Sequence, residues 1–169
     1  MNEFERHIEV LISGQAHAFS AGLTETLPLA RPGVYTIWKS TEFLYVGIAG
    51  RALDLTKTYD KMRGIKDRLD SHWRGRRSGD QFAVYLFDRF VVPILSDQQR
   101  RQFQTGELNG DILTQRFIQT HLSYRFVETT SYREAMMIEK HLAQGKSRAG
   151  FPVLNPNKKA ARSATASGG

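Results

Sequence analysis

The sequence predicts a mixed α/β chain of the α+β kind, in which a small three-stranded antiparallel sheet is flanked by helices. Residues 33–39 and 43–48 are rich in β-branched and aromatic types and are separated by three polar residues, which is typical of a β-hairpin. A third strand is expected at 123–128. Residues 64–74 and 131–145 show the spacing of amphipathic helices. Such helices would cover the faces of the sheet.

The hairpin carries two tyrosines, Tyr35 and Tyr45, one on each strand. Side chains alternate between the faces of a strand, so the two tyrosines share a face only if the connecting loop has an odd number of residues, such as the three at 40–42. If they line one site, a loop with an even number of residues is excluded. Otherwise both are half-buried strand residues whose hydroxyls face water.

The helix expected at 64–74 places Arg68 and His72 one turn apart on the same face. Leu69 and Trp73 form an adjacent apolar stripe that can pack on a core. Arg suits a phosphate because its planar guanidinium stays charged and can bind two oxygens, and His can donate to a phosphate oxygen or orient a water. An Arg/His pair at this spacing is also common on solvated helix faces.

The helix expected at 131–145 has marked ends, because Ser131 and Glu134 form a capping-box pattern and Gly145 is a typical stop. Its core-facing stripe consists of Ala135, Ile138 and Leu142. Glu139 lies beside that stripe. A carboxylate there either extends to solvent or is held in place to bind a cation.

Taken in order, these features resemble the GIY-YIG nuclease superfamily over roughly residues 31–157. The matching positions are Gly33-Val34-Tyr35, Tyr45-Val46-Gly47, Arg68, His72, Glu139 and Asn155, with Ala135 four residues ahead of Glu139. Each tripeptide alone is a weak signal, whereas the ordered set is specific. Both tripeptides carry Val where the family has Ile, a swap that should leave the strands unaffected.

A second departure is the long polar segment between Gly47 and Arg68, which resembles the restriction-endonuclease branch of the superfamily. It leaves Arg63 as an alternative to Arg68 for the catalytic arginine.

The resemblance implies a GIY-YIG fold and a metal-dependent endonuclease that leaves a 5′-phosphate and a 3′-hydroxyl. Glu139 would hold one Mg²⁺ or Mn²⁺ per active site, while Arg68 and His72 would stabilise charge developing on the phosphate. Tyr35 would accept the proton of the attacking water and Tyr45 would position water or substrate, although the two roles can be exchanged. Because a free phenol has a pKa of about 10, nearby cations must lower that pKa or the metal must share the task.

Three further positions are expected to support this site. Gly33 and Gly47 belong to the two tripeptides, and Gly47 would let the backbone approach the phosphate without a Cβ. Asn155 would tie the C-terminal segment to the Glu139 helix rather than touch DNA.

Positive charge is concentrated near the expected site. The chain has a formal net charge of +7, and residues 61–77 contain seven Lys or Arg against two Asp. Such a cluster attracts a polyanion, although charge alone does not distinguish DNA from RNA. With the resemblance, we expect double-stranded DNA as the partner. The residues expected to bind it are Lys66, Trp73, Arg74, Arg76 and Arg77.

Composition predicts one domain in a cytoplasmic protein. The chain has 169 residues, is 40% hydrophobic and contains no cysteine, so disulfides and thiolate metal sites are excluded. No apolar run approaches the roughly 20 residues of a membrane span, and the N-terminal residues lack a signal-peptide pattern. We expect an N-terminal helix and lead-in loop at 1–30, the nuclease domain at 31–157 and a disordered basic tail at 158–169.

Three further helices are expected outside the motifs. Residues 4–12 and 111–122 have helical patterns, and 80–92 is assigned to a helix because Ser78 or Asp80 can cap it and Pro93 follows.

The biological role of cleavage is left open between restriction or defence, which the polar segment favours, and repair or recombination. A catalytically inactive DNA-binding module is the non-enzymatic alternative. A homodimer would supply two active sites for cutting both strands, but the sequence fixes no stoichiometry.

Overall fold

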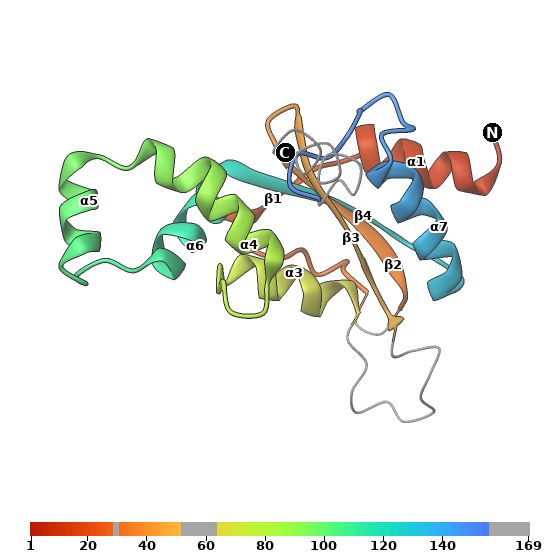
Figure 1. Cartoon of the computed structure of the whole chain (residues 1–169). Coiled ribbons are helices and arrows are strands. Elements are labelled where there is room, and N and C mark those ends of the chain that lie inside the picture. The colour runs from red at the N-terminus through yellow and green to blue at the C-terminus, as the bar shows by residue number, and fades with distance from the viewer. Residues whose placement is uncertain (29–30, 52–63, 156–169) are drawn as a thin grey trace, which may run out of the picture.

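The computed structural model describes residues 1–28, 31–51 and 64–155. Within these ranges the chain has an α+β fold of six α-helices and a four-stranded antiparallel sheet (Figure 1). The elements in chain order are α1 Glu3–Ser13, β1 His17–Ala18, β2 Gly33–Lys39, β3 Glu42–Ala49, α3 Ile65–Trp73, α4 Gln81–Leu86, α5 Asp97–Gln104, α6 Gly110–His121, β4 Leu122–Glu128 and α7 Tyr132–Ala143.

The strands lie in the order β1-β4-β2-β3. The three strands predicted from the sequence are confirmed as β2, β3 and β4, but the prediction of three strands in total is wrong. The fourth strand, β1, has only two residues and pairs with β4 through His17 and Ala18. Two residues are too few to show an alternating pattern, so no sequence signal marks this strand.

Each face of the sheet is covered by its own set of helices. Tyr35 and Ile37 of β2 belong to a core cluster that also contains residues of α3, α4 and α6. Val34 and Trp38, on the opposite face, pack with residues of α1 and α7. Figure 1 shows this division, with α1 and α7 together on one side of the sheet and α3, α4 and α6 on the other. A side chain of β2 or β3 therefore meets one group of helices or the other according to its register.

The β2–β3 hairpin has a loop of two residues, Ser40 and Thr41, and Ser40 has a positive φ of 53°. Tyr35 and Tyr45 nevertheless share a face, because the register pairs Tyr35 with Gly47 and Ile37 with Tyr45. A β-bulge at Leu44, between the pairs Ile37–Tyr45 and Trp38–Phe43, adds one residue to β3 and so returns Tyr45 to the face that carries Tyr35. The exclusion of an even loop is thus wrong, since it assumed an unbroken ladder.

The three helices predicted outside the motifs are confirmed as α1, α4 and α6. Asp80 caps α4 by accepting a hydrogen bond from the backbone N–H of Phe82 at 3.1 Å. Beyond Leu86 the helix continues as a π-helical segment, Phe87–Val91, and a 3₁₀ turn, Val92–Ile94.

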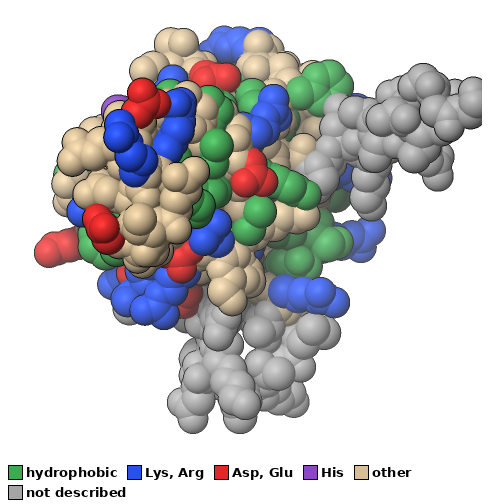
Figure 2. All heavy atoms as spheres, turned by 60° about the vertical axis from the view of Figure 1, so that its left-hand side comes forward, with side chains coloured by type: hydrophobic (Ala, Val, Ile, Leu, Met, Phe, Trp, Pro, Cys, Tyr) green, Lys and Arg blue, Asp and Glu red, His purple; other side chains and the backbone are tan. Residues whose placement is uncertain are grey.

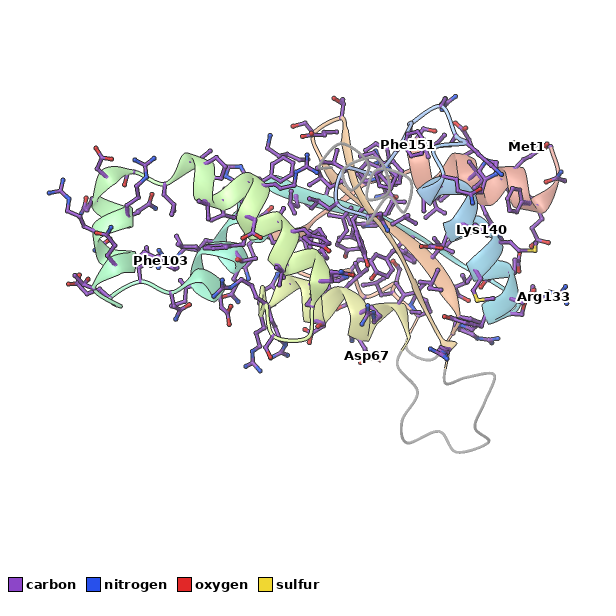
Figure 3. All side chains as sticks on the ribbon, in the orientation of Figure 1. Met1, Asp67, Phe103, Arg133, Lys140 and Phe151 are labelled. Atoms are coloured by element: carbon purple, nitrogen blue, oxygen red, sulfur yellow. The ribbon has the colours of Figure 1, made fainter. Side chains whose placement is uncertain are left out.

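Helix α5 was not predicted, because its residues are almost all polar and none is fully buried. Its aromatic side chain, Phe103, points back toward the body of the molecule, with its ring centroid 6.0 Å from that of Phe87 (Figure 3).

Helix α7 has the predicted boundaries, although its cap differs in one detail. Ser131 accepts a hydrogen bond from the backbone N–H of Glu134 at 3.2 Å, and the helix ends before Gly145, whose φ is +67°. The carboxylate of Glu134 accepts from the backbone N–H of Thr130 at 2.9 Å instead of that of Ser131. The reciprocal half of the expected capping box is therefore displaced by one residue.

Arg63, the alternative catalytic arginine, and the basic tail at 158–169 lie outside the described residues. In the ranges that the structure describes, every helix is too short or too polar to cross a membrane.

The free edge of β3 is covered by the C-terminal segment. The backbone N–H groups of Val153 and Leu154 donate to the carbonyls of Phe43 and Leu44 at 3.0 and 2.7 Å. The side chain of Asn155 then bonds both backbone groups of Val46, accepting from its N–H at 2.8 Å and donating to its carbonyl at 2.9 Å. Asn155 thus anchors the chain to β3 between Tyr45 and Gly47, and not to the Glu139 helix as expected.

We predict that Asn155→Ala lowers the free energy of unfolding by about 1–3 kcal/mol, because both backbone groups of the buried Val46 lose a partner. Denaturant unfolding of the full chain measures the change. Gln98→Ala on the exposed face of α5 is the control and should stay within about 0.5 kcal/mol of the parent. Equal effects in the two variants would contradict the anchoring role.

Candidate functional site

The site is built around Tyr35, which points from β2 toward α3. Its side chain is fully buried, with 0% exposure, and its hydroxyl lies 2.8 Å from Nε2 of His72 on α3. Tyr35 and His72 are 37 positions apart in the chain. The hairpin and the Arg68-His72 helix therefore meet as the motif order indicated.

His72 is held from its other side by Asp80, the cap of α4. Nδ1 of His72 lies 2.6 Å from Oδ2 of Asp80, and the two side chains are 1% and 8% exposed. Both ring nitrogens of His72 are thus occupied within the protein. The expectation that His72 bonds a phosphate oxygen directly is wrong for this geometry, and its contacts instead join three elements.

Asp80 is the site residue that sequence reasoning did not assign. Its position before α4 marked it as a helix cap, and it does cap that helix. One oxygen of its carboxylate serves the cap and the other serves His72. A single sequence does not show whether the second carboxylate oxygen of a capping Asp is free or bonded to another side chain.

Both glycines of the tripeptides are required by packing. A Cβ on Gly47 would overlap the hydroxyl and Cζ of Tyr35, and a Cβ on Gly33 would overlap the carbonyl oxygen of Val127 and the side chain of Ile65. The space above Gly47 is therefore filled by the phenol. The expectation that Gly47 leaves room for a phosphate is corrected accordingly.

Tyr45 lies at the rim of the same cluster and is only half-buried. Its ring packs 5.8 Å from that of His72, 5.1 Å from that of Phe82 and 6.3 Å from that of Tyr35, measured between centroids. Of the two phenols, Tyr45 is the one that retains exposure to solvent. Tyr35, which is fully buried, lies behind it.

The pKa values of both phenols are raised, so the described cations do not provide the first of the two expected routes, a lowered phenol pKa, and the sharing of the task by a metal stays a prediction. Burial raises the pKa of Tyr35 far above its ordinary value, the neighbouring Tyr45 raises it further, and the charge of Arg68 opposes the shift without reversing it. Burial also raises the pKa of Tyr45, again opposed by Arg68. Both shifts in pKa disfavour the phenolate form.

Arg68 is half-buried on α3, one turn before His72. Its positive charge favours the ionised form of both tyrosines, which places the guanidinium close to both hydroxyls. The structure therefore brings Tyr35, Tyr45, Arg68 and His72 together on one face of the sheet.

Glu139 lies on α7, on the other side of the sheet from Tyr35 and α3. Helix α7 packs on the face that carries Val34 and Trp38, yet the Glu139 carboxylate lies close enough to Tyr45 to raise the pKa of that phenol. Because β3 is an edge strand, a side chain at the margin of α7 can influence Tyr45 across it. The charge of Glu139 therefore acts on Tyr45. Among the described residues, no hydrogen bond connects Glu139 to either phenol.

The electrostatics of Glu139 fit a metal ligand. Burial raises the pKa of this half-buried carboxyl, and no described cation offsets the cost. Among the described residues there is no group of three or more His, Asp or Glu side chains that could ligate a metal. A divalent cation here would be held by Glu139 with water and substrate oxygens, an arrangement that Mg²⁺ accepts.

The residues expected to contact DNA fall into two groups. Lys66 and Arg76 are exposed, and Arg74 forms an exposed pair with Asp70 at 2.7 Å, which is weak enough to exchange for a phosphate. Figure 2 shows Lys and Arg side chains spread over one face of the molecule, with a few Asp and Glu among them.

Trp73 and Arg77 have structural partners instead. The indole of Trp73 packs against the core and donates to the carbonyl of Phe19 at 3.2 Å. Arg77 bonds Asp111 at the start of α6 at 2.9 Å, and its guanidinium lies 4.6 Å from the ring centroid of Phe87. Both residues hold neighbouring elements together, and their contact with DNA stays a prediction.

Comparisons with family models, curated proteins and solved structures give no match to this chain. The resemblance to GIY-YIG nucleases therefore rests on the motif residues of the sequence alone.

We predict that Gly47→Ala destabilises the fold by about 1–3 kcal/mol, because the new methyl overlaps the buried phenol of Tyr35. Denaturant unfolding measures the loss. In a Tyr35→Ala background the space is already open, so the same substitution should cost less. An equal cost in both backgrounds would show that Tyr35 is not the obstacle.

We predict that Glu139→Gln raises Tm at neutral pH. Its folded-state pKa is raised, so Glu139 favours folding while protonated, and this contribution is lost as pH rises through the folded pKa. The advantage of the Gln variant should therefore shrink as pH falls toward about 4.3, the ordinary pKa of Glu. Thermal unfolding across this range tests it, with exposed Glu107→Gln as the control; a pH-independent difference would contradict the mechanism.

Proposed function

We propose that this protein is a metal-dependent endonuclease that hydrolyses phosphodiester bonds of DNA to a 5′-phosphate and a 3′-hydroxyl. The observation that carries the proposal is that four side chains lie together on one face of the hairpin: Tyr35, Tyr45, Arg68 and His72. The charge of Glu139 raises the pKa of Tyr45. These residues are the ones that the GIY-YIG resemblance assigns to the active site.

Arg68 is the phosphate-binding group in this proposal. It acts on the half-buried phenol of Tyr45 and is itself half-buried, so its charge acts in a partly desolvated site. A guanidinium in that position neutralises the negative charge that develops on the phosphate oxygens during attack. A fixed cation does this without reorganisation, which is why a held Arg is more effective than bulk counterions.

Glu139 is the proposed ligand of one Mg²⁺ or Mn²⁺. When bound, such an ion supplies Lewis-acid stabilisation of the scissile phosphate and its leaving oxygen. The carboxylate contributes one negative ligand, and its unfavourable burial is relieved when a cation is present.

Tyr45 takes the position next to water and substrate, and Tyr35 supports it from behind. The partial exposure of Tyr45 and the complete burial of Tyr35 favour the expected position of Tyr45 beside water or substrate. Since both pKa values are raised, each phenol acts as a neutral hydroxyl that donates and accepts hydrogen bonds. The proton of the attacking water therefore needs an acceptor other than a free phenolate.

Double-stranded DNA is the proposed substrate, with Lys66, Arg74 and Arg76 as phosphate contacts. The long polar segment before Arg68 supports a restriction or defence role over repair or recombination. A cytoplasmic location accords with both roles. Cutting both strands would require either two sites in a homodimer or successive single-strand cuts.

We predict that the full chain cleaves plasmid or branched DNA in the presence of Mg²⁺ or Mn²⁺, and that Glu139→Ala and Arg68→Ala each lose at least about 10²-fold in rate. Gel assays of plasmid and of branched oligonucleotides measure cleavage, with end-labelling to identify the 5′-phosphate product. Exposed Glu107→Ala is the matched acidic control and should cut at the parental rate.

The substrate that is cut separates the biological roles. Cleavage at one sequence supports restriction, and cleavage at junctions supports repair. Binding to DNA without cleavage under any metal condition would identify a DNA-binding module and refute the nuclease assignment.

A further inference from the structure

The hydrogen-bond chain from Tyr35 through His72 to Asp80 has a defined direction. The three side chains are 0%, 1% and 8% exposed, so water does not compete for their polar atoms. Nδ1 of His72 is 2.6 Å from Oδ2 of Asp80, and a carboxylate oxygen can only accept. The hydrogen of that contact therefore belongs to Nδ1 of the imidazole.

We infer that Asp80 is a positioning residue that holds neutral His72 in the Nδ1–H tautomer and so keeps Nε2 available as the acceptor of the Tyr35 hydroxyl proton. The 2.8 Å contact between Nε2 and the Tyr35 oxygen is then an O–H···N bond, with Tyr35 as donor. The kinetic consequences rest on the proposed nuclease function, whereas the tautomer does not.

This arrangement supplies the proton acceptor that the two phenols lack. The attacking water gives one proton to the Tyr45 oxygen while the Tyr45 hydroxyl passes its own proton to the Tyr35 oxygen, so Tyr45 stays neutral as well. At the same time the Tyr35 O–H bond breaks and an N–H bond forms at Nε2 of His72. Tyr35 stays neutral throughout, the water becomes hydroxide, and His72 becomes an imidazolium that Asp80 stabilises. The proton returns to solvent by the reverse path after product release.

A substitution at Asp80 can separate its contact with His72 from its role as the cap of α4. Its Oδ1 caps α4 through the N–H of Phe82, and Asn is as good an N-cap as Asp. Asp80→Asn therefore keeps the helix start and the side-chain shape. It removes the charge and introduces an amide that can donate to Nδ1, which favours the other tautomer of His72.

The first experiment is NMR of the full chain with ¹⁵N-labelled histidine and no DNA. We expect the two-bond ¹⁵N–¹H pattern of neutral His72 to show protonation at Nδ1 in the parent and a shift toward Nε2–H in Asp80→Asn. Tyr35→Phe assigns the coupled ring, because it changes the Nε2 environment. Asp88→Asn, an exposed acid on the same helical segment, should leave the pattern unchanged. An Nε2–H tautomer in the parent, or no change in Asp80→Asn, would overturn the inference.

The second experiment is kinetic and uses the DNA substrate that the cleavage assay identifies. Asp80→Asn should lower kcat by about 10²-fold or more with KM nearly unchanged, since general-base assistance contributes at least that much. In a Tyr35→Phe background the further loss should be small, because both changes interrupt one pathway. Full additivity, or an effect on KM alone, would refute the relay. If no DNA is cut, the nuclease assignment fails while the NMR result still decides the tautomer.

Discussion

The contact between Tyr35 and His72 is the interaction on which the rest of the site depends. It joins β2, an inner strand of the sheet, to α3, and Asp80 extends the connection to the start of α4. A buried phenol, imidazole or carboxyl without a partner is costly, so these three groups stabilise one another only if all the elements are in place. The register of the hairpin, the packing of α3 and the cap of α4 are thereby fixed together.

Glu139 stands apart from this network, on a helix that packs against the other face of the sheet. The half-buried charge of Glu139 lowers the stability of the fold. The buried polar groups of Tyr35, His72 and Asp80, by contrast, are hydrogen-bonded to one another. The site thus combines a rigid, self-contained part with one acidic group that gains from an external cation. A protein that kept Glu139 for stability alone would have no reason to bury an uncompensated charge there.

Much of the fold could be predicted because its main elements carry strong local patterns. The strands around Tyr35 and Tyr45 and the capped helix before Gly145 follow periodicity and turn chemistry. The bulge at Leu44 could not be foreseen, since it alters pairing without altering composition. The second partner of Asp80 and the partner of Arg77 could not be foreseen for a related reason: tertiary packing decides which partner a polar side chain selects, and neither the Asp80–His72 contact nor the Arg77–Asp111 pair has a signature at a fixed spacing.

The two-residue turn and the bulge at Leu44 have a consequence for how such a chain can change over time. If the ladder became regular at Leu44 with no change in length, Tyr45 would pair with Thr36 instead of Ile37, and its side chain would move to the face covered by α7. Loss of one residue from this hairpin is therefore tolerated only where the bulge is lost with it, because Tyr45 then stays opposite Ile37. The tip of the hairpin, although it is far from the chemistry, is under the same evolutionary constraint as the phenol it keeps in phase.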